Sequence, residues 1–176
     1  MPHVEPLARE EIRDPELQGL IDQSEALGVP GALFARILAR APGHAKALLR
    51  AMVLSHAEGR VDHQLKEVIR IQLARTAGDP YFASLRSAKA QAAGLDEETV
   101  EAGCGNFDAD PRFSEAEKCA LRYARRMYLA PTEVDAAFYA ELKKHFTEAQ
   151  VMELGAFIAF HYGMQVFMRT LSVSEP

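Results

Sequence analysis

The stretch Leu65–Leu95, LKEVIRIQLARTAGDPYFASLRSAKAQAAGL, decides how the rest of the chain is interpreted. Its first half has one apolar stripe at helical spacing. That stripe comprises Leu65, Val68, Ile69, Gln72 and Leu73. Glu67, Ile71 and Ala74 fall together on the opposite side of the same predicted helix. Because the helix is apolar on two sides, we expect Glu67 to be partly buried, which is unusual for a glutamate without a partner.

The second half of the stretch begins a new helix at Asp79-Pro80, which we predict to end at Gly94. Aspartate followed by proline is typical of a helix start, where the carboxylate accepts backbone N–H bonds. Those bonds and the helix dipole favour the ionised carboxylate. Helix capping is therefore the first interpretation of Asp79, and a capped aspartate is a poor general acid.

From Leu65 to Val100 the chain resembles the alkylhydroperoxidase D and carboxymuconolactone decarboxylase superfamily. The family segment has a glutamate, then a C-x-x-C motif, a histidine, an alanine and a glycine at fixed spacing. Glu67 holds the glutamate position. Asp79 and Phe82 stand where the two cysteines belong, and Arg86 stands where the histidine belongs. The resemblance therefore implies the scaffold with a degenerate C-x-x-C motif.

The C-terminal half extends the resemblance to the peroxidase-related branch of the superfamily. The segments FSEAEKCALRYARRMY (113–128) and FTEAQVMELGAFIAFHYGMQVFMRTLSV (146–173) are similar to its tail helices. With them the likeness covers about residues 33 to 173. It implies an all-α fold of about eight or nine helices in a single domain over residues 1–176. Helix-start signals agree with this interpretation. They occur at Asp14, Pro42, Asp62, Asp79, Ser114, Thr132 and Thr147.

The composition of the chain argues against nucleic acids and membranes as binding partners. The chain has 176 residues, 48% hydrophobic residues and a formal net charge of −5. It is therefore globular and lacks the basic stripe of a nucleic-acid-binding protein. The first residues show no secretory signal pattern. The most apolar segment, Val151–Met168, contains Glu153, His161 and Gln165 and predicts a buried helix. We expect a cytoplasmic protein with no nucleic acid and no membrane among its partners.

The substitutions argue against the thiol peroxidase reaction of the family. That reaction needs a thiolate and a resolving thiol one turn away. Asp79 cannot be oxidised reversibly, and Phe82 offers no thiol. Arg86 cannot release a proton near neutral pH. The two cysteines of the chain, Cys104 and Cys119, are interpreted as a loop thiol and a core thiol, with a redox role left open.

Glu67, Arg86, His56 and His161 are the predicted catalytic residues. In the family fold the glutamate and histidine positions approach each other, so we expect Glu67 to face Arg86. The pair is either a closed salt bridge or a site in which Arg86 anchors a carboxylate and Glu67 acts as base. His56 and His161 lie among apolar residues. Each is either a core histidine or the proton-transfer group that Arg86 cannot provide.

Asp79, Tyr81 and Phe82 are the predicted substrate-binding residues at the start of the second helix. His63 follows the predicted cap Asp62 and is expected to lie in solvent. No cluster of histidines or carboxylates has the spacing of a metal site, so we predict neither a metal nor another cofactor.

Three functions remain open from the sequence. The first is a non-redox enzyme or binder of small molecules, with carboxylates as the expected class by analogy with the decarboxylase branch. The second is a catalytically silent structural relative, and the third is an antioxidant peroxidase. The family resemblance and the apolar tail also predict a homo-oligomer, a dimer or larger. The tail's large apolar residues are Phe157, Phe160, Met164, Phe167 and Met168.

Overall fold

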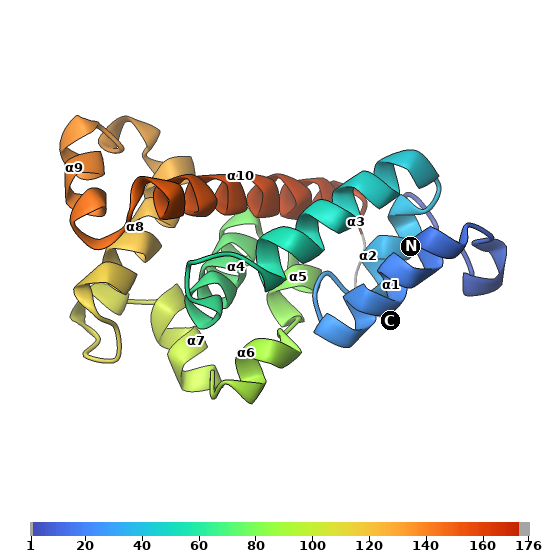
Figure 1. Cartoon of the computed structure of the whole chain (residues 1–176), viewed down its shortest axis with the longest axis horizontal. Coiled ribbons are helices and arrows are strands. Elements are labelled where there is room, and N and C mark those ends of the chain that lie inside the picture. Colours follow the sequence, from blue (N-terminus) through green and yellow to red (C-terminus); the bar gives the residue numbers. More distant parts are fainter. Residues whose placement is uncertain (1, 173–176) are drawn as a thin grey trace.

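The computed structural model describes residues 2–172, and these residues form an all-α fold without strands (Figure 1). Residues 1 and 173–176, which the predicted domain includes, lie outside the described part of the chain. The α-helices are α1 (Pro15–Leu27), α2 (Ala32–Leu38), α3 (Pro42–Ala57), α4 (His63–Ala77), α5 (Pro80–Ser84), α6 (Ala88–Ala92), α7 (Glu97–Cys104), α8 (Glu115–Leu129), α9 (Ala136–His145) and α10 (Glu148–Thr170). Short 3-10 helices are η1 (Arg9–Glu11), η2 (Phe107–Ala109) and η3 (Pro131–Glu133).

Most predicted helix starts are confirmed, because side chains there accept backbone N–H bonds. Asp14 accepts bonds from Glu16 N and Leu17 N at the start of α1. Asp62 accepts a bond from Leu65 N at the start of α4. α8 and α10 begin with complete capping boxes at Ser114 and Thr147, as their sequences predict. Local sequence therefore places most of the long helices correctly.

The segment predicted as one helix over residues 80–94 is instead two short helices, α5 and α6. Leu85–Ser87 between them is not helical. Ser87 has extended backbone angles, and its hydroxyl accepts a bond from Ala90 N at 3.3 Å. Ser87 is thus a second helix cap inside the predicted helix. The break changes the direction in which Arg86 leaves the backbone.

One other helix start differs from the prediction. The helix expected from Thr132 begins at Ala136, with Asp135 as its cap and η3 before it.

α4 lies at the centre of the fold, with α10 along it and α3, α5 and α7 around it (Figure 1). One hydrophobic cluster joins α4 to α7, α8, α9 and the first half of α10. A second cluster joins α1, α2, α3 and α5 to the end of α10. α4 contributes to both, with Ile69 in the first and Ala74 in the second. α4 is therefore packed on both predicted sides, although Ile71 of the second side lies in the first cluster with Ile69.

α10 runs along the long axis of the molecule, between α9 at one end and the N-terminal helices at the other (Figure 1). By length and composition it is apolar enough to cross a membrane, with a mean hydropathy of 1.2. One side of it, including Ile158, His161 and Gln165, is buried. Met152, Val166 and Phe167 on its other side are exposed. The predicted buried helix is thus buried on one side.

Candidate functional site

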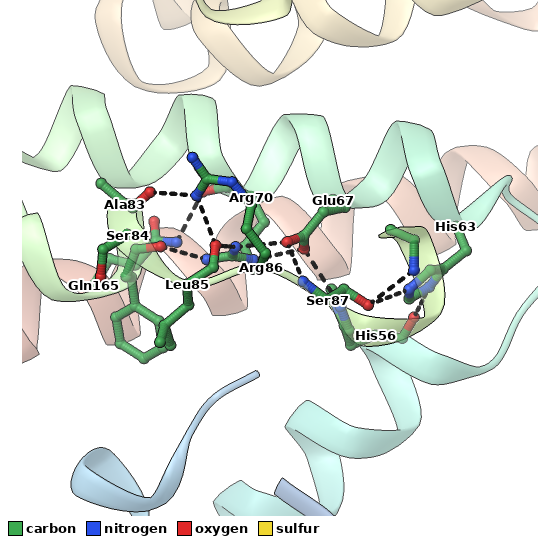
Figure 2. Close-up of polar contacts among 12 residues, drawn as sticks. His56, His63, Glu67, Arg70, Ala83, Ser84, Leu85, Arg86, Ser87 and Gln165 are labelled. Atoms are coloured by element: carbon green, nitrogen blue, oxygen red, sulfur yellow. Dashed lines mark hydrogen bonds and ion pairs between the residues drawn. The ribbon is translucent and has the colours of Figure 1, made fainter. Parts of the chain in front are cut away.

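Glu67 lies near the middle of the fold, on α4, and its side chain is completely buried. Arg70 donates from Nε to Glu67 Oε2 and from Nη2 to Oε1, both at 2.8 Å (Figure 2). The backbone N–H of Ser87 donates to Oε1 at 2.8 Å. Burial by itself raises the pKa of Glu67, but the Arg70 charge and these bonds lower it to about 2. Glu67 is therefore buried as predicted, and it is ionised.

The expected pairing of Glu67 with Arg86 is wrong. Arg86 forms a two-pronged ion pair with Glu97, with Nε–Oε1 at 2.7 Å and Nη2–Oε2 at 2.8 Å. Its Nη1 donates to the carbonyls of Ala83 and Leu85. The physical reason is the break between α5 and α6, since Arg86 leaves an extended segment rather than a helix. Its side chain is 19% exposed, at the surface.

Arg70 is the residue that the sequence analysis missed. It is completely buried, and besides Glu67 it bonds the end of α5. Nη1 donates to Phe82 O at 2.6 Å and Nη2 donates to Leu85 O at 2.7 Å. The spacing of Glu67 and Arg70 was the available signal. Residues three apart face the same side of a helix, and a buried carboxylate needs a cation.

Two buried histidines approach this ion pair from other helices. His56 on α3 and His161 on α10 are each 1% exposed, with ring centres 5.9 Å apart. His56 Nε2 lies 3.5 Å from Glu67 Oε2. Within residues 2–172 none of the four ring nitrogens has a hydrogen-bond partner. Burial lowers the pKa of His56 to about 3 and lowers that of His161 well below its usual value. Both imidazoles are therefore neutral at neutral pH.

His63 is half-buried, although the sequence predicts it in solvent. Its Nδ1 lies 2.8 Å from His56 O, and its Nε2 lies 2.8 Å from Ser87 Oγ (Figure 2). A carbonyl only accepts hydrogen bonds, so Nδ1 must carry the proton and Nε2 of the neutral ring accepts from the Ser87 hydroxyl. Burial lowers the pKa of His63, which favours this neutral form. His63 therefore connects α3, α4 and the cap of α6.

Asp79 caps α5 as predicted. Its Oδ1 accepts bonds from Tyr81 N at 3.0 Å and from Phe82 N at 3.4 Å. Its Oδ2 is buried, and no described residue bonds to it. Burial raises the pKa of Asp79 more than these backbone bonds lower it, so the expected preference for the ionised form is weaker than a free helix start would give.

Tyr81 and Phe82, expected to line a substrate pocket, lie in the packed core of the second cluster. The Tyr81 hydroxyl donates to Pro30 O at 3.0 Å. The Phe82 ring is completely buried and meets the Phe34 ring edge-on, with centres 5.1 Å apart. Phe82, at the position predicted for the second cysteine, is therefore a packed core residue.

The buried group of Glu67, Arg70, His56 and His161, here called the α4 site, is closed to solvent. Four surface hollows of about 280 to 430 Å³ are lined by other residues. A ligand larger than water can therefore reach the α4 site only if neighbouring side chains move.

The described residues form neither a metal-binding cluster nor a reactive thiol site. Residues 2–172 hold no group of three or more His, Cys, Asp or Glu side chains suited to a metal ion. Cys104 is partly buried and Cys119 is buried, and both thiols are free. Burial raises the pKa of each thiol, the opposite of what a reactive thiolate requires.

Comparisons with known proteins give structural neighbours but no sequence relatives. No protein-family model and no curated protein matches the chain. The debrominase Bmp8 superposes with a TM-score of 0.83 at 23% identity, over 98% of this chain and 91% of the other. A Cys-to-Ala variant of Bmp8 in complex with 2,3,4-tribromopyrrole has a TM-score of 0.82, also at 23% identity, over 97% of this chain and 90% of the other.

A second group of neighbours is peroxidase-related. An uncharacterized protein from Ralstonia eutropha with an alkylhydroperoxidase AhpD core has a TM-score of 0.82 at 15% identity, over 99% of this chain and 92% of the other. An uncharacterized peroxidase-related protein from Silicibacter sp. has a TM-score of 0.75 at 14% identity, over 98% and 88%. Likeness at these identities concerns the fold. The fold implied by the sequence motif is therefore confirmed, and the chain has the alkylhydroperoxidase D-like helical fold.

Proposed function

We propose that this protein is a non-redox enzyme or binder of small molecules that uses the α4 site. One observation carries the proposal: two neighbouring buried imidazoles have no hydrogen-bond partners, and one of them, His56, lies beside an ionised carboxylate. Leaving a buried polar group unpaired costs about 1–3 kcal/mol. A purely structural core gains nothing from two such groups, whereas a ligand site does.

The residues of the α4 site have complementary roles in this proposal. Arg70 fixes the carboxylate of Glu67, which faces His56 Nε2 at 3.5 Å. A proton on Nε2 would point toward Glu67 and leave Nδ1 free to accept a proton from a ligand. Glu67 would then stabilise the imidazolium, as carboxylates do in other proton-transfer pairs. His161 would supply the second contact to the ligand.

Carboxylate selectivity, expected from Arg86, is not part of this proposal. Arg86 is occupied by Glu97 and two carbonyls, so a carboxylate ligand would have to displace Glu97. Carboxylate binding at Arg86 stays a prediction that depends on this exchange.

The neighbours support a small-molecule role without supplying the reaction. The Bmp8 variant is described in complex with a small aromatic molecule, which shows that this fold can hold one. This chain has Asp79 and Phe82 at the two predicted cysteine positions. We therefore propose no thiol-dependent peroxidase or debrominase reaction for it.

A ligand screen by saturation-transfer NMR tests the proposal. The screen compares the wild-type chain with the double variant His56→Leu/His161→Leu, and His44→Ala on the exposed start of α3 is the control. We expect compounds that bind the wild type and the control but not the double variant. A library with no binder that depends on the two histidines would sink the proposal. Cumene hydroperoxide with a dithiol reductant should show no consumption above the protein-free rate.

A catalytically silent relative is the second candidate. The observation that favours it is the closed packing at Phe82, whose ring is completely buried at the place of the family thiol. This candidate expects no ligand at the α4 site and no effect of the double variant on any binding.

We also propose that the chain forms a homo-oligomer. Met152 and Phe167 on α10 are 63% and 43% exposed, and Leu54 on α3 is 58% exposed. Large apolar side chains on adjacent helices favour contact with another chain. Light scattering should give a mass above 19.4 kDa that falls in Phe167→Glu. A monomer mass for the wild type would exclude the oligomer.

A further inference from the structure

Buried polar atoms without a partner gather around one turn of α4. Within residues 2–172, seven buried side-chain N or O atoms lack a hydrogen-bond partner, and five of them belong to His56 (two), His161 (two) and Gln165 (one). Gln165 follows His161 by one turn of α10. Its Nε2 donates to Arg70 O at 3.0 Å, which leaves Oε1 unpaired. Unpaired acceptors and donors therefore face Glu67 and Arg70 from two other helices.

The charged groups beside these atoms are already neutralised. Arg70 uses four hydrogen bonds on Glu67, Phe82 O and Leu85 O. Lys66, the other buried cation, donates to Ser55 O, Glu58 O and Glu153 Oε1, which uses all three of its protons. An anionic ligand would find no available cation there, and the Glu67 carboxylate already accepts bonds from Arg70 and from Ser87 N.

Aromatic rings form the walls beside the imidazoles. Phe157 stacks on His56 with ring centres 6.1 Å apart and lies 4.1 Å from the His161 ring centre. Phe160 meets His161 edge-on at 5.7 Å and is itself partly exposed. Aromatic walls of this kind suit a flat molecule, which could enter only if neighbouring side chains move.

We infer that His56, His161 and Gln165 recognise an uncharged, flat ligand that carries both a hydrogen-bond donor and an acceptor, as amides, azoles and phenols do. The inference rests on the proposed function and adds the chemical class of the ligand. The neutral His161 ring offers one donor and one acceptor. His56 offers Nδ1 as an acceptor while its Nε2 proton faces Glu67, and Gln165 Oε1 offers another acceptor. A charged ligand would be buried without a counter-charge, which costs several kcal/mol.

Three probes of the same shape separate charge from size: benzamide is neutral, benzoate is anionic and benzamidine is cationic. Each is titrated into the wild-type chain while the imidazole nitrogens of His56 and His161 are followed by long-range ¹H–¹⁵N NMR. We expect benzamide to shift both sets of signals and to bind roughly tenfold or more tightly than either charged probe. Gln165→Leu, which keeps the core volume, should weaken benzamide by roughly fivefold or more. His44→Ala should leave its affinity unchanged.

Two results would overturn the inference in different ways. Preference for benzoate, lost in Arg86→Gln, would show that the ligand is a carboxylate, and the small-molecule function would stand. No imidazole shift with any probe would show that these histidines do not receive such a ligand. The library screen with the double variant then decides the function separately.

Discussion

Two glutamate–arginine pairs in this chain have the same two-pronged geometry in opposite surroundings. Glu67–Arg70 joins neighbouring turns of α4 and is fully buried. Glu97–Arg86 joins α7 to the segment between α5 and α6, with side chains 61% and 19% exposed. Water screens the second pair, so its contribution to stability is about 0–1 kcal/mol. The first pair is protected from water, and removing one member leaves a buried charge.

The difference teaches that a residue's position in a family motif does not decide its partner. Arg86 stands at the motif histidine, yet the carboxylate that it was expected to meet bonds Arg70 instead. Arg70 reaches Glu67 along one helix and has no loop to cross. The buried pair therefore affects the stability of the fold, whereas water can replace the partners in the exposed pair at little cost.

The largest effect is expected from Arg70→Met. The variant leaves Glu67 buried without a cation and removes the bonds to Phe82 O and Leu85 O. The free energy of unfolding should fall by about 3–5 kcal/mol, measured by urea denaturation. The double variant Glu67→Leu/Arg70→Met should recover part of this loss, because it removes the unpaired charge as well. A loss no larger than that of Arg86→Met would break the comparison.

Acid should destabilise the buried region before it affects the carboxylate. The pKa of His56 is lowered by burial from 6.5 to about 3, with Glu67 opposing and Arg70 adding to the shift. The folded state therefore binds this proton more weakly than the unfolded state, so stability is full above pH 6.5 and is lost as pH falls toward 3. At pH 5 we expect His56 to account for about 2 kcal/mol less stability than at pH 7.5, and His161, whose pKa is also lowered, adds a loss in the same direction.

The window between pH 5 and 6.5 isolates the histidines, because Glu67 begins to contribute only below pH 4.5. His56→Phe should reduce the pH dependence of urea unfolding there, and His161 and His63, whose pKa values are also lowered by burial, should account for the rest. An unchanged slope in that variant would mean that another group carries the effect.

His161→Leu is expected to stabilise the fold while it removes a ligand contact. It replaces two unpaired ring nitrogens with an apolar side chain among Phe157 and Phe160. The gain should be about 1–2 kcal/mol, or about 2–8 °C in Tm by calorimetry. A loss of stability instead would indicate that His161 has a structural hydrogen bond that the fold needs.

The smallest effect is expected at the surface pair. Glu97→Gln should reduce the free energy of unfolding by less than about 1 kcal/mol. Because the pair is exposed, the reduction should shrink when salt is raised from about 0.1 to 1 M. A loss that does not respond to salt would mean that Glu97 and Arg86 are less hydrated than their exposure indicates.

The sequence predicted the fold well, because its signals are local or belong to a family frame. Capping residues such as Asp14 and Ser114 act within one helical turn. The residues that follow Glu67 match a family motif with fixed spacing, so the motif alone indicates the fold. The Ser87 cap was missed because serine followed by Ala-Lys-Ala also suits a helix interior. Arg70 was missed because the motif directed attention to Arg86, which the Ser87 cap turns outward.

The histidines show a different limit of sequence reasoning. Their apolar neighbours predicted burial of His56 and His161, and both are buried. Their approach to Glu67 depends on how α3 and α10 pack on α4, which no local pattern encodes. Their predicted catalytic role is tested by the ligand screen with the double variant His56→Leu/His161→Leu.

The bonds of Arg70 to Glu67 and to the end of α5 also limit what thiols introduced into this chain could do. Cysteines at positions 79 and 82 and a histidine at position 86 would complete the motif that the sequence resembles. The glutamate that should shuttle protons to those thiols would still be neutralised by Arg70. Release of Glu67 would require removal of that guanidinium, which leaves a buried carboxylate without a cation. Arg70 thus keeps Glu67 from carrying protons between other groups.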